Sequence, residues 1–417
     1  MGKKVVIVGG AAGGASAAMR LRRLDENAEI RIIERGDDVS YSTCCLPYFL
    51  SRRVADSKRL ILMTPDRFRR QYNIEVRTKE EVTAICRQEK RVRVRRQDGS
   101  EYEEPYDVLL LATGGNPILP AEVAGSDQAH VFTLHDVADA ERIEAFIRQP
   151  EIVHAVVVGG GFAGCETAEN LVKAGKKVTM VEATDQVMPP FDFDMAQILT
   201  KELLDQGVTL LLNDRLTRIE ERTVTLSGGG CVPADVVIFA LGNAPETRLA
   251  KDCGLPCGPS GGLMVDRRYR TADEAIYAVG DMIEVPLRLT GKKGRLPMAW
   301  PAQMEGRAAA DAICGLPHRS KGFLGSAVLS LFSLYAASTG LTEKAAQAAG
   351  FDTTAVYVIP ADKVSLMPGS HPLHLKLIFE SHTGQILGAQ AIGRDAADRR
   401  IDVVAALIAM GGTLDDL

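Results

Sequence analysis

The sequence lacks an excess of basic charge, a long apolar run and the compositional bias of a disordered chain. Its 49 Lys and Arg residues stand against 54 Asp and Glu, a net charge of −5, which is the wrong sign for a general nucleic-acid-binding protein. No apolar run reaches the ~18 residues that a membrane-spanning helix requires. Hydrophobic residues make up 46% and charged residues 25% of the chain, which excludes intrinsic disorder and a collagen-like repeat.

Cysteines are few and irregularly spaced, with eight in 417 residues. Cys253 and Cys257 form a Cys-x-x-x-Cys pair, but no further Cys or His follows at a spacing that would complete a zinc site, and we expect no bound metal. The N-terminal run imitates a signal peptide, yet four glycines between Gly9 and Gly14 would interrupt its apolar helix. We therefore expect a cytoplasmic protein with reduced thiols.

The 39 glycines cluster in two similar segments. VVIVGGAAGGASAAMRLRR begins at Val5, and AVVVGGGFAGCETAENLVKAG begins at Ala155. In each segment an apolar strand runs directly into glycines and then into apolar residues at helical spacing, which predicts a repeated nucleotide-binding unit. At about 150 residues per domain, the chain has room for roughly three domains.

The first glycine cluster has the form Gly-x-Ala-x-x-Gly, with Gly9, Ala11 and Gly14 at the three positions. Gly9 permits a tight turn, Ala11 lets the backbone approach a pyrophosphate, and Gly14 lets the following helix pack on the strand. Glu34 follows the next strand, where its carboxylate is placed to accept hydrogen bonds from ribose hydroxyls. These residues predict a dinucleotide site.

The second cluster has the full Gly-x-Gly-x-x-Gly form, with Gly159, Gly161 and Gly164, and Glu182 follows its next strand. A carboxylate here accepts from the free 2′-hydroxyl of NADH and repels the 2′-phosphate of NADPH. No Arg or Lys between Ala183 and Met188 offsets that repulsion. The sequence therefore predicts a preference for NADH.

A third segment, Thr271 to Asp281, reads as a short strand that ends in Gly280-Asp281. A carboxylate at this point suits the ribityl chain of FAD, and the segment resembles the second FAD motif of two-dinucleotide flavoprotein disulfide reductases. Thr113 and Gly114 in ATGG, and Gly242 in LGNAP, resemble the domain-crossing segments of that family. The resemblance implies that the first loop binds FAD and the second binds NADH.

Other segments predict the outline of the fold. The run KRVRVRR at Lys90 is expected to form a hairpin opposite the glutamates at 101–104 rather than a phosphate-binding patch. Pro301 is expected to lead a helix with a face of small residues. From Gly325 onward, alternating strands and a helix at Ile401–Met410 predict a separate antiparallel domain. The expected fold class is α/β, with two Rossmann-like dinucleotide-binding domains and a C-terminal α+β interface domain.

The segment YSTCCLPY at Tyr41 is the candidate catalytic motif. Pro47 and the apolar residues after it indicate that a helix begins near Cys44. A thiol at a helix N-terminus meets unpaired amide donors, which favour the reactive thiolate. The competing interpretation is a buried structural cysteine, so a reactive role for Cys44 requires at least partial exposure of its thiol.

VSYSTCCLPY resembles the active-site segment of the coenzyme A-disulfide reductase and NADH-dependent persulfide reductase family, which are single-cysteine pyridine nucleotide-disulfide oxidoreductases. The resemblance extends to TPDRF at Thr64 and RRID at Arg399. It implies that Cys44 forms a mixed disulfide or persulfide with substrate sulfur beside the flavin. The positions that match the family's coenzyme A contacts are Ser16, Arg20, Arg23, Ser40 and Thr43, and the two arginines suit phosphate groups.

Three positions depart from the family pattern. Thr43 replaces the usual Asn, Cys45 replaces a small residue, and Leu366-Met367 replaces a tyrosine-containing pair that reaches the partner's active site in relatives. A vicinal Cys44–Cys45 disulfide would be a strained ring, and we do not expect it to form. The identity of the sulfur substrate is therefore left open among coenzyme A disulfide, coenzyme A persulfide and polysulfide.

The leading hypothesis is an enzyme that transfers electrons from NADH through FAD to a sulfur–sulfur bond at Cys44. An NADH oxidase or peroxidase that cycles Cys44 through sulfenic acid is an alternative, although Ala12 stands where such relatives carry His. A flavin redox partner protein is a further alternative. Reductases with two active-site cysteines are disfavoured because the sequence contains no Cys-x-x-x-x-Cys.

The expected domains are an FAD-binding domain at 1–116 and 246–322, an NAD-binding domain at 117–245, and a C-terminal dimerisation domain at 323–417. The resemblance implies a homodimer. It also implies a further C-terminal Tyr-Ala-Pro-Pro stretch. Because this sequence stops at Leu417, we expect either a truncated last domain or a variant with an altered dimer.

Overall fold

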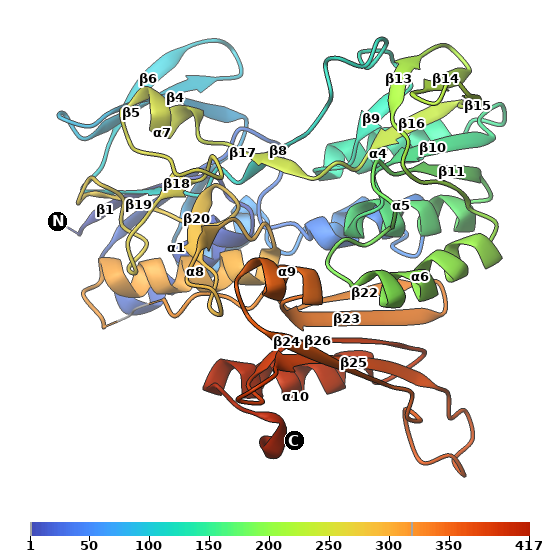
Figure 1. Cartoon of the computed structure of the whole chain (residues 1–417). Coiled ribbons are helices and arrows are strands. Elements are labelled where there is room, and N and C mark those ends of the chain that lie inside the picture. The colour runs from blue at the N-terminus through green and yellow to red at the C-terminus, as the bar shows by residue number, and fades with distance from the viewer. Residues whose placement is uncertain (1, 318–319) are drawn as a thin grey trace. The chain divides into compact units, whose positions relative to one another are not determined.

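The computed structural model describes residues 2–317 and 320–417 (Figure 1). The chain folds into two compact units. The first unit comprises Met1–Leu46, Val54–Asn116 and Asn243–Phe323, and the second comprises Pro47–Arg53, Pro117–Gly242 and Leu324–Leu417. This division into two units does not test the boundaries predicted for three domains, which stay a prediction.

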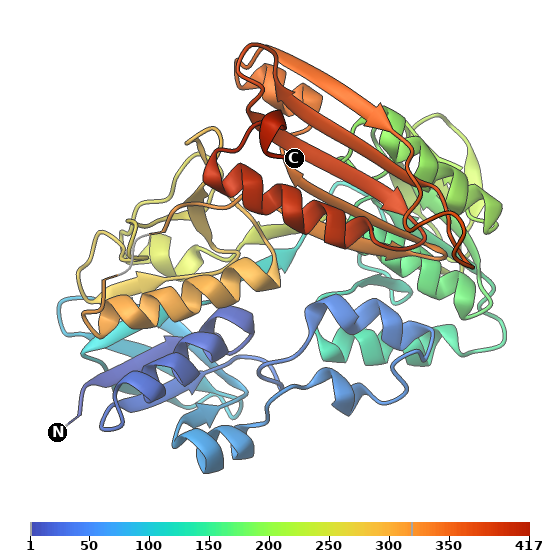
Figure 2. The ribbon, with the colours of Figure 1, turned by 90° about the horizontal axis from the view of Figure 1, so that it is seen from below.

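A five-stranded parallel sheet in the order β19-β7-β1-β2-β3 forms the centre of the first unit. Its strands are β1 (Lys4–Val8), β2 (Glu29–Ile33), β3 (Glu75–Arg77), β7 (Val108–Leu111) and β19 (Ile276–Ala278). The side chains of β7 are all buried, as expected for a parallel strand covered on both faces. Helices α1 (Ala12–Leu24) and α8 (Ala299–Ile313) lie side by side (Figures 1 and 2).

The predicted start of α8 at Pro301 is wrong by two residues, because the helix begins at Ala299. Proline has no amide hydrogen, and the first-turn amides of a helix have no intrahelical acceptor, so Pro301 fits within the first turn as well as at its start.

The first unit also contains a three-stranded antiparallel sheet of β4 (Glu80–Cys86), β5 (Arg91–Arg96) and β6 (Glu101–Pro105). Opposite charges pair across β5 and β6, with Arg91 Nη1 2.9 Å from Glu103 Oε2. The basic run therefore forms the charge-paired hairpin that the sequence predicts. The smaller elements are η2 (Ser57–Leu60), α3 (Pro65–Tyr72), α7 (Arg248–Asp252), β18 (Leu263–Met264), β20 (Ile283–Pro286) and β21 (Lys293–Gly294).

The second unit repeats this plan with a parallel sheet in the order β12-β11-β10-β16-β9. Its strands are β9 (Val131–Thr133), β10 (His154–Val158), β11 (Lys177–Val181), β12 (Thr209–Leu211) and β16 (Val236–Phe239). Its helices are α4 (Val137–Ile147), α5 (Phe162–Lys173) and α6 (Phe193–Asp205). A small antiparallel sheet contains β13 (Leu216–Ile219), β14 (Thr223–Leu226) and β15 (Cys231–Pro233).

The C-terminal residues form an antiparallel sheet in the order β22-β23-β26-β25-β24. Its strands are β22 (Ala327–Leu331), β23 (Leu334–Gly340), β24 (Thr353–Val358), β25 (Leu373–Glu380) and β26 (Ile386–Gly393), with helices α9 (Glu343–Ala348) and α10 (Ala397–Met410). Helix α10 lies along this sheet (Figure 2). Leu329 and Ile392 share one apolar core with Val157 of the parallel sheet. The predicted α/β fold class with a C-terminal α+β domain is confirmed.

The remaining short elements are η1 (Thr43–Cys45), α2 (Leu46–Leu50), the strands β8 (Gly115–Pro117) and β17 (Asn243–Pro245), and η3 (Leu414–Asp416) near the C-terminus. Within the described residues, none of the helices combines the length and apolar character needed to cross a membrane.

Candidate active site

The first glycine loop joins β1 to α1 at a point where only small residues fit. Gly9 has φ +99°, and a Cβ atom there would lie 2.2 Å from the carbonyl oxygen of Ala112. A Cβ atom on Gly14 would lie 2.0 Å from the carbonyl oxygen of Gly9. Both glycines therefore allow the close approach of α1, β1 and β7 on which a dinucleotide loop depends.

The N-terminus of α1 is suited to an anion. Ala11 provides no side-chain cap, and the first turn contains no acidic residue. By contrast, α3 and α4 are capped by the side chains of Thr64 and Asp136. The first amides of α1 thus lack a side-chain cap, and together with the positive end of the helix dipole they fit the pyrophosphate of FAD.

Four neighbouring strands of the first unit direct the predicted FAD residues to one edge of the sheet. Because β19, β7, β1 and β2 are parallel, their carboxyl ends meet at that edge. The residues that follow these ends include Asp281, Thr113, Gly114, Gly9 and Glu34. The arrangement fits one extended dinucleotide laid across the strand ends.

Among the predicted FAD residues beyond the glycine loop, Glu34, Asp281 and Thr113 each have a defined hydrogen bond. Glu34 accepts the amides of Gly10 and Gly36, each at 2.8 Å. Asp281 accepts from Asn243 Nδ2 at 3.1 Å. The Thr113 hydroxyl donates to the carbonyl oxygen of Glu246 at 2.7 Å, and a Cβ atom on Gly114 would meet open space.

The second glycine loop joins β10 to α5 and has the same construction. Gly159 has φ +109°, and a Cβ atom on Gly164 would lie 1.9 Å from the Gly159 carbonyl oxygen. Gly161 caps α5 without a side chain and faces open space, and the first turn carries no acidic residue. The loop therefore fits a second pyrophosphate. Gly242, which follows β16 with φ +82°, also faces open space.

Glu182 lies at the carboxyl end of β11, beside the second loop. Its Oε2 accepts the amide of Gly160 at 2.6 Å, and its Oε1 accepts both the amide and the hydroxyl of Thr184 at 2.8 Å. The carboxylate is thereby fixed next to the loop, and it retains lone pairs beyond these three hydrogen bonds.

Cys44 lies in the short helix η1, and its side chain is exposed. Cys45 is half-buried, and both residues remain thiols rather than a vicinal disulfide. The predicted helix follows directly as α2, but it has only five residues, so its dipole is small. Exposure meets the condition set for a reactive cysteine, whereas the helix contributes less to thiolate formation than the sequence predicts.

The residues after Cys45 pack against α5, the helix that follows the second glycine loop. The Tyr48 hydroxyl donates to Glu166 Oε1 at 3.4 Å, and the Ser51 hydroxyl donates to Asn170 Oδ1 at 2.6 Å. Burial, with the nearby charge of Glu169, raises the pKa of Glu166 to about 7. Sequence reasoning missed Glu166, although its place in the repeated segment, two residues after Gly164, was visible.

The predicted substrate residues lie mostly along α1 and near Cys44. Ser16 is partly exposed, Arg23 and Thr43 are exposed, and Ser40 is buried with φ +49°. Arg20 is held by Asp311 of α8, with Nε 2.7 Å from Oδ1. Arg23 is therefore the more accessible of the two predicted phosphate-binding arginines.

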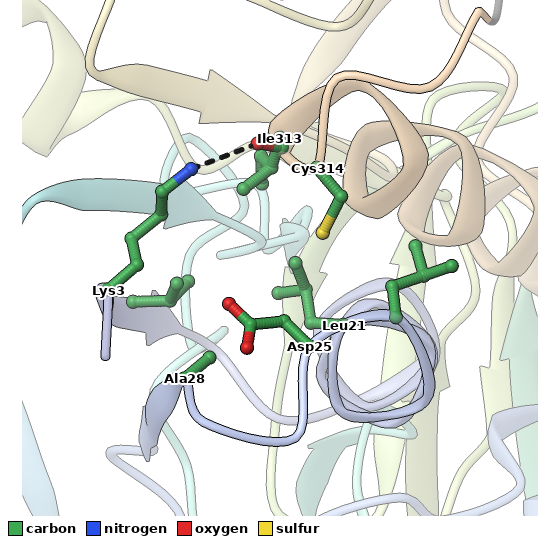
Figure 3. A pocket seen from close by; sticks show the side chains of 8 residues that line it. Lys3, Leu21, Asp25, Ala28, Ile313 and Cys314 are labelled. Atoms are coloured by element: carbon green, nitrogen blue, oxygen red, sulfur yellow. Dashed lines mark hydrogen bonds between the residues drawn. The ribbon is translucent and has the colours of Figure 1, made fainter. Parts of the chain in front are cut away.

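A cavity of about 230 Å³ in the first unit lies away from the glycine loop of that unit. Its lining includes Lys3, Asp25 and Cys314, and Lys3 Nζ donates to the carbonyl oxygen of Ile313 at 3.2 Å (Figure 3). Lys3 precedes β1, and the other residues lie where α1 and α8 end, so the cavity is at the edge opposite the glycine loop. Burial raises the pKa of the Cys314 thiol, which disfavours a reactive role.

Two glycine loops, each with an acidic residue beside it, together with an exposed thiol define an oxidoreductase with two dinucleotides. The chain belongs to the pyridine nucleotide-disulphide oxidoreductase family: the family model matches residues 3–306, and the model of the family's dimerisation domain matches residues 327–417. FAD and NADH are accordingly its cofactors.

Several known proteins are similar along nearly the whole chain. A coenzyme A disulfide reductase of Staphylococcus haemolyticus is 31% identical over 417 residues, which cover 100% of this chain and 93% of the relative. The solved structure of reduced CoADR-RHD from Bacillus anthracis has 39% identity and a TM-score of 0.98, covering 100% of this chain and 76% of that one. An NAD-dependent persulfide reductase from A. fulgidus has 35% identity and a TM-score of 0.96, covering 99% and 78%.

Proposed function

We propose that this enzyme reduces a low-molecular-weight disulfide or persulfide, most specifically that of coenzyme A, through Cys44. The observation that carries the proposal is the exposed Cys44 thiol in a chain with two dinucleotide loops. The similarity to proteins named coenzyme A disulfide reductase and persulfide reductase supports the same substrate class.

The chemistry at Cys44 is thiol–disulfide exchange. The Cys44 thiolate attacks one sulfur of the substrate, forms a mixed disulfide and releases the first thiol. FAD supplies the two-electron chemistry that connects NADH with this disulfide. Two electrons cleave the mixed disulfide, restore the Cys44 thiolate and release the second thiol. In sum, one disulfide, one NADH and one proton give two thiols and NAD⁺.

Substrate binding is assigned to Ser16, Arg20, Arg23, Ser40 and Thr43. Arg23 is exposed, so its guanidinium is available to a phosphate of coenzyme A. Arg20 uses Nε to bind Asp311 and retains other N–H donors, because a guanidinium has five in all. Coenzyme A disulfide should therefore bind more tightly than a disulfide without phosphate groups.

Anaerobic titration tests this function. The enzyme is reduced with NADH and then mixed with coenzyme A disulfide, coenzyme A persulfide, polysulfide or cystine, while flavin absorbance is followed. We expect rapid reoxidation by a coenzyme A substrate and slow reoxidation by cystine. Reoxidation only by oxygen or by a protein acceptor would reject the proposal.

The enzyme is further proposed to be a homodimer in the cytoplasm. Residues 327–417 match a dimerisation domain, and large exposed apolar side chains gather on the edge strand β24 and the loop after it: Val356, Tyr357, Val358, Ile359, Val364, Leu366 and Met367. Such a cluster is typical of an oligomer interface. Sedimentation equilibrium of the full chain tests the dimer.

A further inference from the structure

Glu305 is a buried carboxyl group on α8, close to the predicted FAD residues. Its side chain is only 2% exposed. Its Oε2 accepts the backbone amide of Gly280 at 2.6 Å. A buried carboxyl group is costly unless it is hydrogen-bonded and uncharged. Its hydrogen bond goes to the turn after β19, at the edge of the sheet where the predicted FAD residues lie.

The turn that Glu305 holds is the one that carries Asp281. Gly280 follows β19 and has φ +82°, a conformation that glycine adopts without strain. The amide that Glu305 binds is therefore one residue before Asp281. Asp281 itself accepts a hydrogen bond from Asn243 Nδ2 at 3.1 Å. Glu305 acts on the backbone before Asp281, and Asn243 acts on its carboxylate.

The same stretch of α8 also packs against the phosphate-binding helix α1 (Figure 2). A Cβ atom on Gly306 would lie 2.3 Å from the carbonyl oxygen of Gly13, and a Cβ atom on Gly13 would lie 3.0 Å from Val279 Cγ2. Glu305 thus lies where α8, α1 and the turn after β19 converge. A shift of its side chain would change the spacing between the glycine loop and Asp281.

We infer that Glu305 is a positioning residue for FAD: by holding the Gly280 amide, it sets the Asp281 carboxylate at the distance from the α1 N-terminus that the cofactor requires. This inference rests on FAD as the cofactor and does not depend on which sulfur substrate is reduced.

Ionisation of Glu305 should make the affinity for FAD depend on pH. The pKa of Glu305 is raised to about 8, because burial and the nearby charge of Asp281 together outweigh the lowering effect of the hydrogen bond from the Gly280 amide. The facing ionisable groups are Asp281 and Tyr269, whose phenol has a pKa raised by burial to about 12 and is uncharged below that pH. Since bound FAD adds the negative charge of its pyrophosphate, ionised Glu305 disfavours FAD, and the affinity should fall above about pH 8.

Release of FAD from the full-length holoenzyme measures this effect. The holoenzyme is diluted at pH 6.5 to 9.5, and the dissociation constant is obtained from the rise in flavin fluorescence. We expect the wild-type dissociation constant to increase above pH 8. Glu305→Gln should bind FAD within about threefold of wild type at pH 7 and should lose this increase, because a neutral amide still accepts the Gly280 amide.

Glu305→Ala leaves the Gly280 amide without its acceptor and should raise the dissociation constant by about tenfold or more at pH 7. Glu284→Ala is the matched control, since Glu284 is equally buried but accepts from Ser260 instead; it should retain the wild-type pH profile. If the Glu305→Ala variant does not fold, the Glu305→Gln profile decides the question. A Glu305→Gln profile that rises above pH 8 as in wild type, or wild-type affinity in a folded Glu305→Ala variant, would overturn the inference.

Discussion

Glu182 Oε2 accepts the amide of Gly160 at 2.6 Å, so the residue predicted to bind the ribose also holds the glycine loop. Glu34 has the same relationship with Gly10 in the first unit, at 2.8 Å. Each carboxylate joins the end of one strand to the loop after the neighbouring strand. The repeat visible in the sequence therefore extends to the hydrogen bonds of the two dinucleotide sites.

The first prediction concerns the choice of nicotinamide cofactor. Glu182→Gln removes the negative charge that repels a 2′-phosphate, while its amide oxygen still accepts from Gly160. The ratio of kcat/KM for NADPH to that for NADH should rise by about tenfold or more. Glu34→Gln is the control in the other loop and should leave this ratio unchanged. An unaltered ratio in Glu182→Gln would show that another residue excludes NADPH.

A second prediction separates two glycines of the same loop. Gly164→Ala places a methyl group 1.9 Å from a backbone oxygen, and we expect a loss of about 3 kcal/mol or more in the free energy of unfolding. Gly161→Ala adds a methyl group where Ala11 has one in the first loop, with open space around it. Its melting temperature should match wild type, while KM for NADH rises. Equal melting temperatures for both variants would contradict the proposed packing.

The third prediction concerns pH and Glu166. A pKa of about 7 in the folded state exceeds the ordinary glutamate value of about 4.3. Between these values the folded protein binds more protons than the unfolded chain, so stability falls as pH rises and levels off above about pH 7. Glu166→Gln should remove this part of the slope and be more stable than wild type at pH 8 by about 1–2 kcal/mol, since the carboxyl is partly solvated. Chemical denaturation at pH 5 and pH 8 measures the difference; equal slopes would refute it.

A fourth prediction tests an ion cluster in the second unit. Lys376 of β25 is 4% exposed and lies 2.6 Å from Glu343 and 2.9 Å from Asp194 of α6. Lys376→Met leaves these carboxylates without their counter-charge and should destabilise the protein by about 2–4 kcal/mol. Lys201→Met removes an exposed pair with Asp205 and should have almost no effect. Urea denaturation compares them, and equal midpoints would mean that the cluster does not stabilise the C-terminal sheet.

Much of the fold follows from local sequence patterns. The strand Val108–Leu111 has the predicted bounds. A short, continuous apolar run between polar turns is typical of a strand that is buried on both faces of a parallel sheet. The predicted start of α8 at Pro301 was wrong because the two residues before it, Ala299 and Trp300, carry no sequence signal for a helix start. A helix was expected to begin near Cys44, and α2 begins two residues later at Leu46, after the short helix η1 that contains Cys44.

The candidate site was predictable only where a motif marks it. Glycine loops and the Gly-Asp turn have fixed spacings, so their residues could be named in advance. Glu166 and Glu305 could not, because their significance comes from burial and from partners far away in sequence, such as Tyr48 and Gly280. Such contacts depend on tertiary packing that spacing does not encode.

The role of Cys44 is the central claim, and stopped-flow reoxidation of the NADH-reduced enzyme by coenzyme A disulfide tests it most directly. In Cys44→Ser, NADH should still reduce the flavin, but reoxidation by the disulfide should slow by about 10³-fold or more, because a hydroxyl cannot form the mixed disulfide. Cys45→Ser should reoxidise at nearly the wild-type rate. Reoxidation that survives in Cys44→Ser, or that is lost in Cys45→Ser alone, would contradict the assignment of Cys44 as the redox-active thiol.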